Sequence, residues 1–110
     1  MERFVKGEVV VFPFPYTNLS ETKKRPALVI AKLKGENVIL AQITAVKRDD
    51  EDLVPLTKKD FASGSLKHGS FIMLSIITTT ESSSILYKVG KIKQEKIKEV
   101  EKKLCEIFTR

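Results

Sequence analysis

Residues 7–31 read GEVVVFPFPYTNLSETKKRPALVIA, and this stretch decides the fold. Its first part, Glu8–Phe12, is rich in β-branched and aromatic residues, which favour a strand. Pro13 and Pro15 have no N–H to donate to a neighbouring strand, so we expect the strand to end there in a stiff loop. A second apolar run, Ala27–Ala31, follows the loop and predicts a second strand.

Strand signals continue through most of the remaining chain. The other predicted strands span residues 38–44, 53–56, 70–80 and 84–89. Lys34–Asn37 has turn chemistry and should join the second and third strands as a hairpin. Pro55 should confine its short strand to a sheet edge. We expect one helical turn at residues 58–61 and a flexible link at residues 62–65.

The last part of the chain changes to a helical period. Apolar residues recur there every three or four positions among lysines and glutamates: Ile97, Val100, Leu104, Ile107 and Phe108. This spacing predicts an amphipathic helix over residues 94–109. The sequence therefore indicates an α+β, mainly β fold: a small barrel of about six antiparallel strands with a C-terminal helix packed on it.

Length and composition are those of one ordinary globular domain, residues 1–110. Hydrophobic residues make up 42% and charged residues 31% of 110 positions. The longest charge-free runs, 9–20 and 69–80, have 12 residues each, and crossing a bilayer takes about 20. We therefore expect no membrane association. With one cysteine, Cys105, and no signal-peptide pattern, we expect a cytoplasmic protein and a buried, structural cysteine.

The charge is positive and uneven. Twenty Lys and Arg residues against fourteen Asp and Glu give a net charge of +6. Residues 1–48 hold nine basic and four acidic residues, a net of +5, so nearly all the excess lies in the first half. A cluster of lysines and arginines there is suited to neutralising phosphates; its members are Lys23, Lys24, Arg25, Lys32, Lys34, Lys47 and Arg48. An ordinary solvated surface is the alternative.

No motif for a metal or nucleotide cofactor is present. One cysteine and one histidine cannot form a zinc site, and the acidic run 49–52 lacks the spacing of a calcium loop. We therefore expect no cofactor. The lone histidine, His68, lies beside a glycine in a predicted loop, and we expect it to be exposed rather than catalytic.

Arg25 and Thr44 are the best candidates for chemistry. Arg25 precedes Pro26, which biases it towards an extended backbone at the mouth of a strand. Its guanidinium can donate two parallel hydrogen bonds to a phosphate. Thr44 ends the third predicted strand and shares a face with Gln42. If these strands are neighbours, Arg25 and Thr44 meet at one pocket edge. A surface arginine and a strand-forming threonine are the alternative readings.

Residues 7–31 resemble the opening of the PemK/MazF-like toxin family: a glycine–acid pair, an apolar strand, FPF-type residues, a polar loop and KRPALVI. The similarity continues through Ala41–Thr44, residues 69–79, Lys88–Ile92 and the closing helix, and so covers nearly the whole chain.

The resemblance implies an SH3-like barrel, a homodimer, a small acidic antitoxin as partner, DNA binding by the toxin–antitoxin complex, and metal-independent cleavage of single-stranded RNA. In the family's mechanism the 2′-hydroxyl attacks the adjacent phosphorus, which leaves a 2′,3′-cyclic phosphate and a 5′-hydroxyl. The family's essential arginine and threonine fall on Arg25 and Thr44. The residues expected to contact RNA are Phe14 and Tyr16, by stacking on bases, with Thr17, Lys24, Gln42 and Lys47.

The sequence departs from the family pattern in one strand. Some members carry an arginine and an aspartate two positions apart where this chain has Met73 and Ser75, so that acid–base assistance is absent. Two other functions remain open: a noncatalytic RNA- or DNA-binding barrel, and a gyrase poison of the CcdB type. The latter uses a tryptophan-containing tail, and this chain has no tryptophan.

Overall fold

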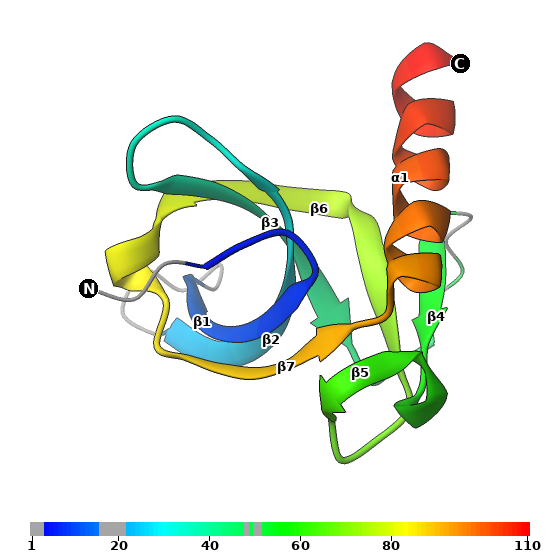
Figure 1. Ribbon diagram of the computed structural model, residues 1–110, viewed down its shortest axis with the longest axis horizontal. Coiled ribbons are helices and arrows are strands. Elements are labelled where there is room, and N and C mark those ends of the chain that lie inside the picture. Colours follow the sequence, from blue (N-terminus) through cyan, green and yellow to red (C-terminus); the bar gives the residue numbers. More distant parts are fainter. Residues whose placement is uncertain (1–3, 16–21, 48, 50–51) are drawn as a thin grey trace.

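The computed structural model describes residues 4–15, 22–47, 49 and 52–110, and in them a single curled antiparallel sheet carries one long helix (Figure 1). The strands are β1 (Glu8–Pro15), β2 (Thr22–Lys32), β3 (Asn37–Thr44), β4 (Leu53–Leu56), β5 (Phe61–Gly64), β6 (Ser70–Glu81) and β7 (Tyr87–Ile92). Their order across the sheet is β4-β6-β3-β2-β1-β7-β5. Short 3₁₀ turns lie at Lys58–Asp60 and Ser82–Ser84, and α1 spans Gln94–Thr109. The predicted fold class is confirmed.

β1 is longer than predicted. It stays paired with β2 through Pro13 opposite Lys24 and Pro15 opposite Thr22. Its other neighbour, β7, ends earlier, with Val11 opposite Tyr87 and the Val11 carbonyl accepting from the Leu86 N–H at 2.9 Å. Both prolines lie an even number of residues after Val11, so their ring nitrogens face the side that β7 has left. A proline on such an edge costs no ladder hydrogen bond.

The central hairpin and the β4 edge agree with the predictions. β2 turns into β3 through residues 33–36, where Gly35 adopts a φ of 76°. β3 then pairs along its length with β6, the longest strand. β4 pairs with β6 alone and is an edge strand, as Pro55 requires.

The prediction was also wrong for β5 and for the position of β7. Residues 61–64, predicted to include a flexible link, form strand β5 on β7, and β7 itself lies about three residues later than predicted. The pairing depends on close backbone approach: a Cβ on Gly64, whose φ is 67°, would lie 2.1 Å from the Val89 carbonyl oxygen. That requirement is tertiary, and small polar residues give no local strand signal.

The two faces of the curled sheet build two hydrophobic cores. Alternation along β2 sends Leu28 into one core, whereas Ala27 and Val29 enter the other. The first core also holds Ile97 and Val100 of α1, so the helix covers this face.

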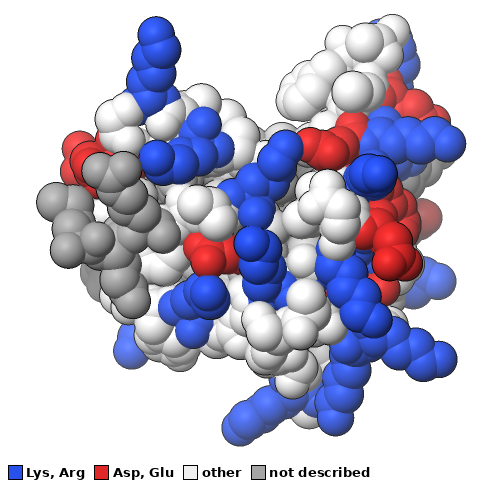
Figure 2. Space-filling model, viewed as in Figure 1, with Lys and Arg blue, Asp and Glu red and all other residues white. Residues whose placement is uncertain are grey.

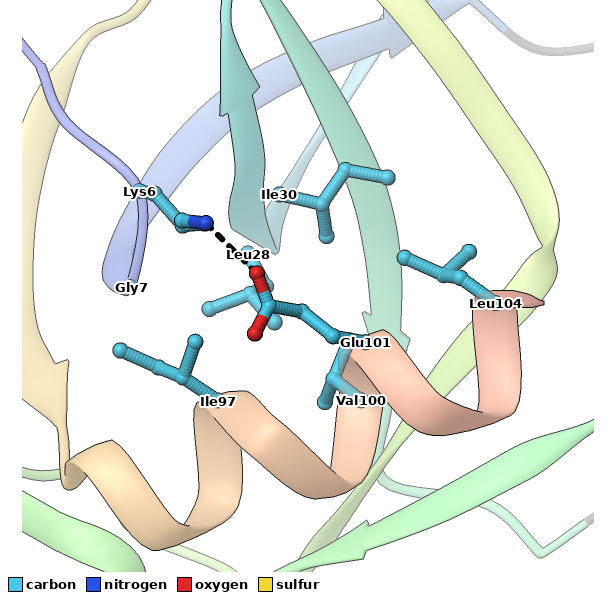
Figure 3. Close-up of a pocket in the computed structure, with 8 residues that line it drawn as sticks. All are labelled: Lys6, Gly7, Leu28, Ile30, Ile97, Val100, Glu101 and Leu104. Carbon is cyan, nitrogen blue, oxygen red and sulfur yellow. Dashed lines mark hydrogen bonds and ion pairs between the residues drawn. The ribbon is translucent and has the colours of Figure 1, made fainter.

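α1 lies against the sheet and projects beyond it at its C-terminal end (Figure 1). Between helix and sheet is an apolar crevice of only about 10 Å³, bridged by Lys6 Nζ and Glu101 Oε2 at 2.6 Å (Figure 3). The predicted helix boundaries are confirmed, but Cys105 is exposed rather than buried, because it lies off the apolar stripe. In the described part of the chain, no helix has the length and apolar character that a membrane span requires.

Gly64→Ala should destabilise the protein more than Gly35→Ala. Both glycines have positive φ, but a Cβ at Gly35 meets no atom within 4 Å, whereas one at Gly64 meets β7 backbone. We expect a loss of about 1–2 kcal/mol for Gly35→Ala and roughly 2–4 kcal/mol for Gly64→Ala, from backbone strain plus overpacking. Urea unfolding of both variants measures this. Equal losses would contradict the close approach of β5 to β7.

Candidate functional site

A cavity of about 250 Å³ opens between the start of β2, the end of β3 and the segment that joins β5 to β6. Pro26, Ile43 and Leu66 supply apolar walls. The polar and charged residues that line it are Lys23, Lys24, Arg25, Thr44, Lys67, His68 and Ser70. Three segments distant in sequence therefore converge on one concave site.

Arg25 and Thr44 come together because β2 and β3 are adjacent. Ala27 lies opposite Gln42, and continuing this register by two residues sets Arg25 opposite Thr44. On its other side Arg25 is paired with Phe12 of β1, which holds its backbone at the start of β2. Its side chain is half-buried. β2 and β3 are neighbours, and Arg25 and Thr44 line the same cavity, as the sequence predicted for adjacent strands.

The Thr44 hydroxyl is held in a fixed orientation. Thr44 is 3% exposed, and its Oγ1 accepts the backbone N–H of Val46 at 3.2 Å. Because Oγ1 is the acceptor in this bond, the bond does not use the hydroxyl hydrogen. That hydrogen can be donated to an oxygen placed in the cavity.

The cavity is strongly cationic. Lys23, Lys24, Arg25 and Lys67 line it, and none of the described residues that line it is Asp or Glu. Many of the acidic side chains lie instead on or beside α1, where they pair with lysines or arginine; Asp52 with Arg110 at 2.8 Å and Glu99 with Lys96 at 2.8 Å are examples. On the face seen in Figure 2, most of the Asp and Glu atoms lie over or beside α1, smaller groups lie on the opposite side, and Lys and Arg dominate the end that carries β5. Such a site favours an anionic ligand.

The predicted RNA-contact residues are not all in this cavity. Lys24 lines it, whereas Gln42 is half-buried between Ala27 and Met73 in the sheet. Lys47 is exposed beyond the end of β3. Tyr16 and Thr17 lie outside the described residues.

Phe14 does not lie on a loop as predicted. It belongs to β1, is 7% exposed, and packs edge-to-face on Phe12 with ring centroids 4.8 Å apart. The face that a base would need is covered by the second hydrophobic core. The burial follows from the continuation of β1 past Pro13, which carries the inward alternation on to residue 14.

The sequence did not indicate the contribution of the segment between β5 and β6. His68 is exposed, as predicted, but it lines the same cavity as Arg25 and Thr44, beside Lys67. Ser70, at the start of β6, is buried, with 6% of its surface exposed. Its hydroxyl donates a hydrogen bond to the His68 backbone carbonyl at 3.0 Å, which ties this segment to β6. The segment reaches the cavity because β5 pairs with β7, and no local pattern in residues 61–70 signals that pairing.

Several solved structures have the same fold as this chain. MazF from Deinococcus radiodurans matches with a TM-score of 0.76, 15% identity and 100% of both chains covered. The MazE–MazF complex of the same organism gives 0.77, 16% identity, and 98% and 97% of the two chains. An endoribonuclease in complex with its cognate antitoxin from Mycobacterial species gives 0.75, 13% identity, and 96% and 94%. At these identities the likeness establishes the fold alone.

Comparison with curated protein sequences gave no match. Comparison with protein families gave a match to the family described as PemK-like, MazF-like toxin of type II toxin–antitoxin system, over residues 5–108. The match includes β1 to β7, the cavity and nearly all of α1. The chain therefore belongs to the PemK-like, MazF-like toxins of type II toxin–antitoxin systems.

Proposed function

We propose that this toxin is an endoribonuclease that cuts single-stranded RNA in the cationic cavity without a metal ion. The observation that carries the proposal is that Arg25 and Thr44 line one cavity with three lysines and no described carboxylate. Two solved structures of the same fold are described as endoribonucleases, which supports the same class of activity here.

The chemistry follows from what the two side chains can do. The 2′-hydroxyl of RNA attacks the adjacent phosphorus, and negative charge builds up on the non-bridging oxygens of the phosphorane. The fork of the Arg25 guanidinium stabilises that charge with two parallel hydrogen bonds. The Thr44 hydroxyl holds one phosphate oxygen. The products are a 2′,3′-cyclic phosphate and a 5′-hydroxyl, and DNA is resistant because it lacks the nucleophile.

The residues of the cavity argue against a bound divalent cation. Mg²⁺ and Ca²⁺ prefer carboxylate and carbonyl oxygens, whereas the charged side chains that line this site are lysines and an arginine, which repel cations. In the part of the chain that the structure describes, no three His, Cys, Asp or Glu residues gather. Arg25 and the lysines supply positive charge where a metal ion otherwise would.

Cleavage in excess EDTA is the first expected outcome. The protein should cut single-stranded RNA at an undiminished rate after chelation and leave cyclic-phosphate ends, which mass spectrometry of the fragments would identify. An all-deoxy strand of the same sequence should stay intact. Loss of cutting on chelation would contradict the metal-independent mechanism, and RNA binding without any cutting would favour the noncatalytic barrel.

Arg25→Ala should nearly abolish turnover in a folded protein. Removal of one group that stabilises a developing oxyanion costs on the order of 10² to 10³ in rate, about 2.7–4 kcal/mol. Arg25→Lys should restore little, because an ammonium cannot replace the planar fork. Lys98→Ala is the matched control, since Lys98 is an exposed cation of α1, outside the cavity lining. Cleavage by Arg25→Ala within about threefold of wild type would refute the assignment.

We also propose a homodimer that binds a small acidic antitoxin. At about 250 Å³ the cavity is below the usual 300–1,000 Å³ of ligand sites, so one subunit holds little of an RNA strand and a twofold partner would extend the path. Solved relatives of this fold include MazF with MazE, which supports an antitoxin partner.

An acidic antitoxin segment should compete with RNA for the cationic cavity. Sedimentation velocity at micromolar concentrations should show a dimer, and addition of the acidic partner should inhibit RNA cleavage in proportion to its binding. A monomer at all concentrations would contradict the shared path. Tight binding that leaves cleavage unchanged would contradict the competition.

A further inference from the structure

The cavity has an excess of proton donors. The charged side chains of the described lining are Lys23, Lys24, Arg25 and Lys67, and ammonium and guanidinium groups can donate hydrogen bonds but not accept them. Thr44 and Ser70 add alcohols, which are very weak bases. None of the described residues lining the cavity is a carboxylate. Attack by a 2′-hydroxyl nevertheless requires a group that accepts its proton.

Among the described residues of the lining, His68 is the side chain that meets this need. Neutral imidazole has one acceptor nitrogen, and histidine is the side-chain type that changes protonation between pH 5 and 8. His68 lies on the segment between β5 and β6 and lines the same cavity as Arg25 and Thr44 of β2 and β3. Its side chain is exposed, so it can reach a bound strand and exchange protons with water.

The backbone around His68 is anchored, which a positioned base requires. The buried Ser70 hydroxyl donates to the His68 carbonyl at 3.0 Å, and Ser70 lies opposite Leu56 at the start of β6. On the other side of the segment, Gly64 lies opposite Gly90 in the β5–β7 pair. Both ends of a short connection are thus fixed to the sheet.

We infer that His68 is the general base of the RNA-cleavage site. This inference rests on the proposed endoribonuclease activity and adds the proton acceptor that Arg25 and Thr44 cannot provide. The imidazole nitrogen takes the 2′-hydroxyl proton as the 2′-oxygen bonds to phosphorus. The bond from phosphorus to the 5′-oxygen breaks, and that oxygen leaves with a proton from water. The imidazolium then returns its proton to solvent.

His68→Gln tests the assignment on a single-stranded RNA that the wild-type protein cuts. We expect kcat to fall by about 10²- to 10⁴-fold with little change in KM, since glutamine can bind phosphate but cannot take up a proton. Wild-type kcat should fall as the pH is lowered from 8 to 5, because a protonated imidazole has no acceptor nitrogen. The other charged groups that face His68 in the described lining are Lys23, Lys24, Arg25 and Lys67. The variant should lose this dependence, and added imidazole should restore part of its rate.

Ser65→Gln is the matched control, because Ser65 is an exposed residue of the same segment outside the cavity lining, and it should cut like wild type. A substrate whose 5′-leaving oxygen is replaced by sulfur needs no proton on departure. His68→Gln should remain slow on it, and recovery of the rate would overturn the assignment as base and make His68 an acid. Unchanged cutting of ordinary RNA by His68→Gln would overturn the inference alone. Failure of wild type to cut any RNA would overturn the proposed function as well.

Discussion

The register of β2 against β3 is the constraint on which the cavity depends. Leu28 lies opposite Ala41 in one core, while Ala27 and Val29 of β2 face the second core with Leu40 of β3. A slip of one residue would exchange these faces and drive the side chains of both cores to the wrong side. Burial therefore locks the register, and the locked register brings Arg25 to the level of Thr44. The hydrophobic cores position polar groups that they do not contain.

Charge is separated over the surface in a way that serves the cavity. Several acidic residues of α1 are paired with nearby lysines, as with Lys6 and Glu101 at 2.6 Å and Lys96 and Glu99 at 2.8 Å. Exposed pairs of this kind contribute little to stability, typically about 0–1 kcal/mol each. Their effect on the electrostatic potential at the cavity matters more than their effect on stability, because carboxylates held at α1 do not offset the charge of the cavity lysines. A polyanion approaching the cavity thus meets a net positive potential, which steers its binding.

The sequence predicted the elements that have strong local periodicity. The boundaries of α1, the β2–β3 hairpin and the edge position of β4 all follow from local pattern and proline chemistry. It did not predict β5, the continuation of β1 through Pro13 and Pro15, or the burial of Phe14. Each of these features depends on the position of another strand: β5 forms because β7 lies beside it, and β1 continues through the prolines because β7 ends earlier. The same division applies to the cavity: Arg25, Thr44 and Lys24 were foreseeable in β2 and β3, whereas Lys67 and His68 reach it through a pairing with no local signal.

The cavity residues on β2 and β3 and those on the segment between β5 and β6 are therefore held in place by different contacts. Arg25 and Thr44 lie in strands that pair on both sides and border both hydrophobic cores. His68 is held by Ser70 and by β5, a four-residue edge strand whose contact with β7 requires glycine at Gly64 and Gly90. Edge strands with few buried side chains open at lower free energy than central ones. The groups that bind phosphate thus stand on the most stable part of the sheet, and the proposed proton acceptor stands on the least stable part. A change that loosens β5 would separate binding from proton transfer without disturbing the β2–β3 register.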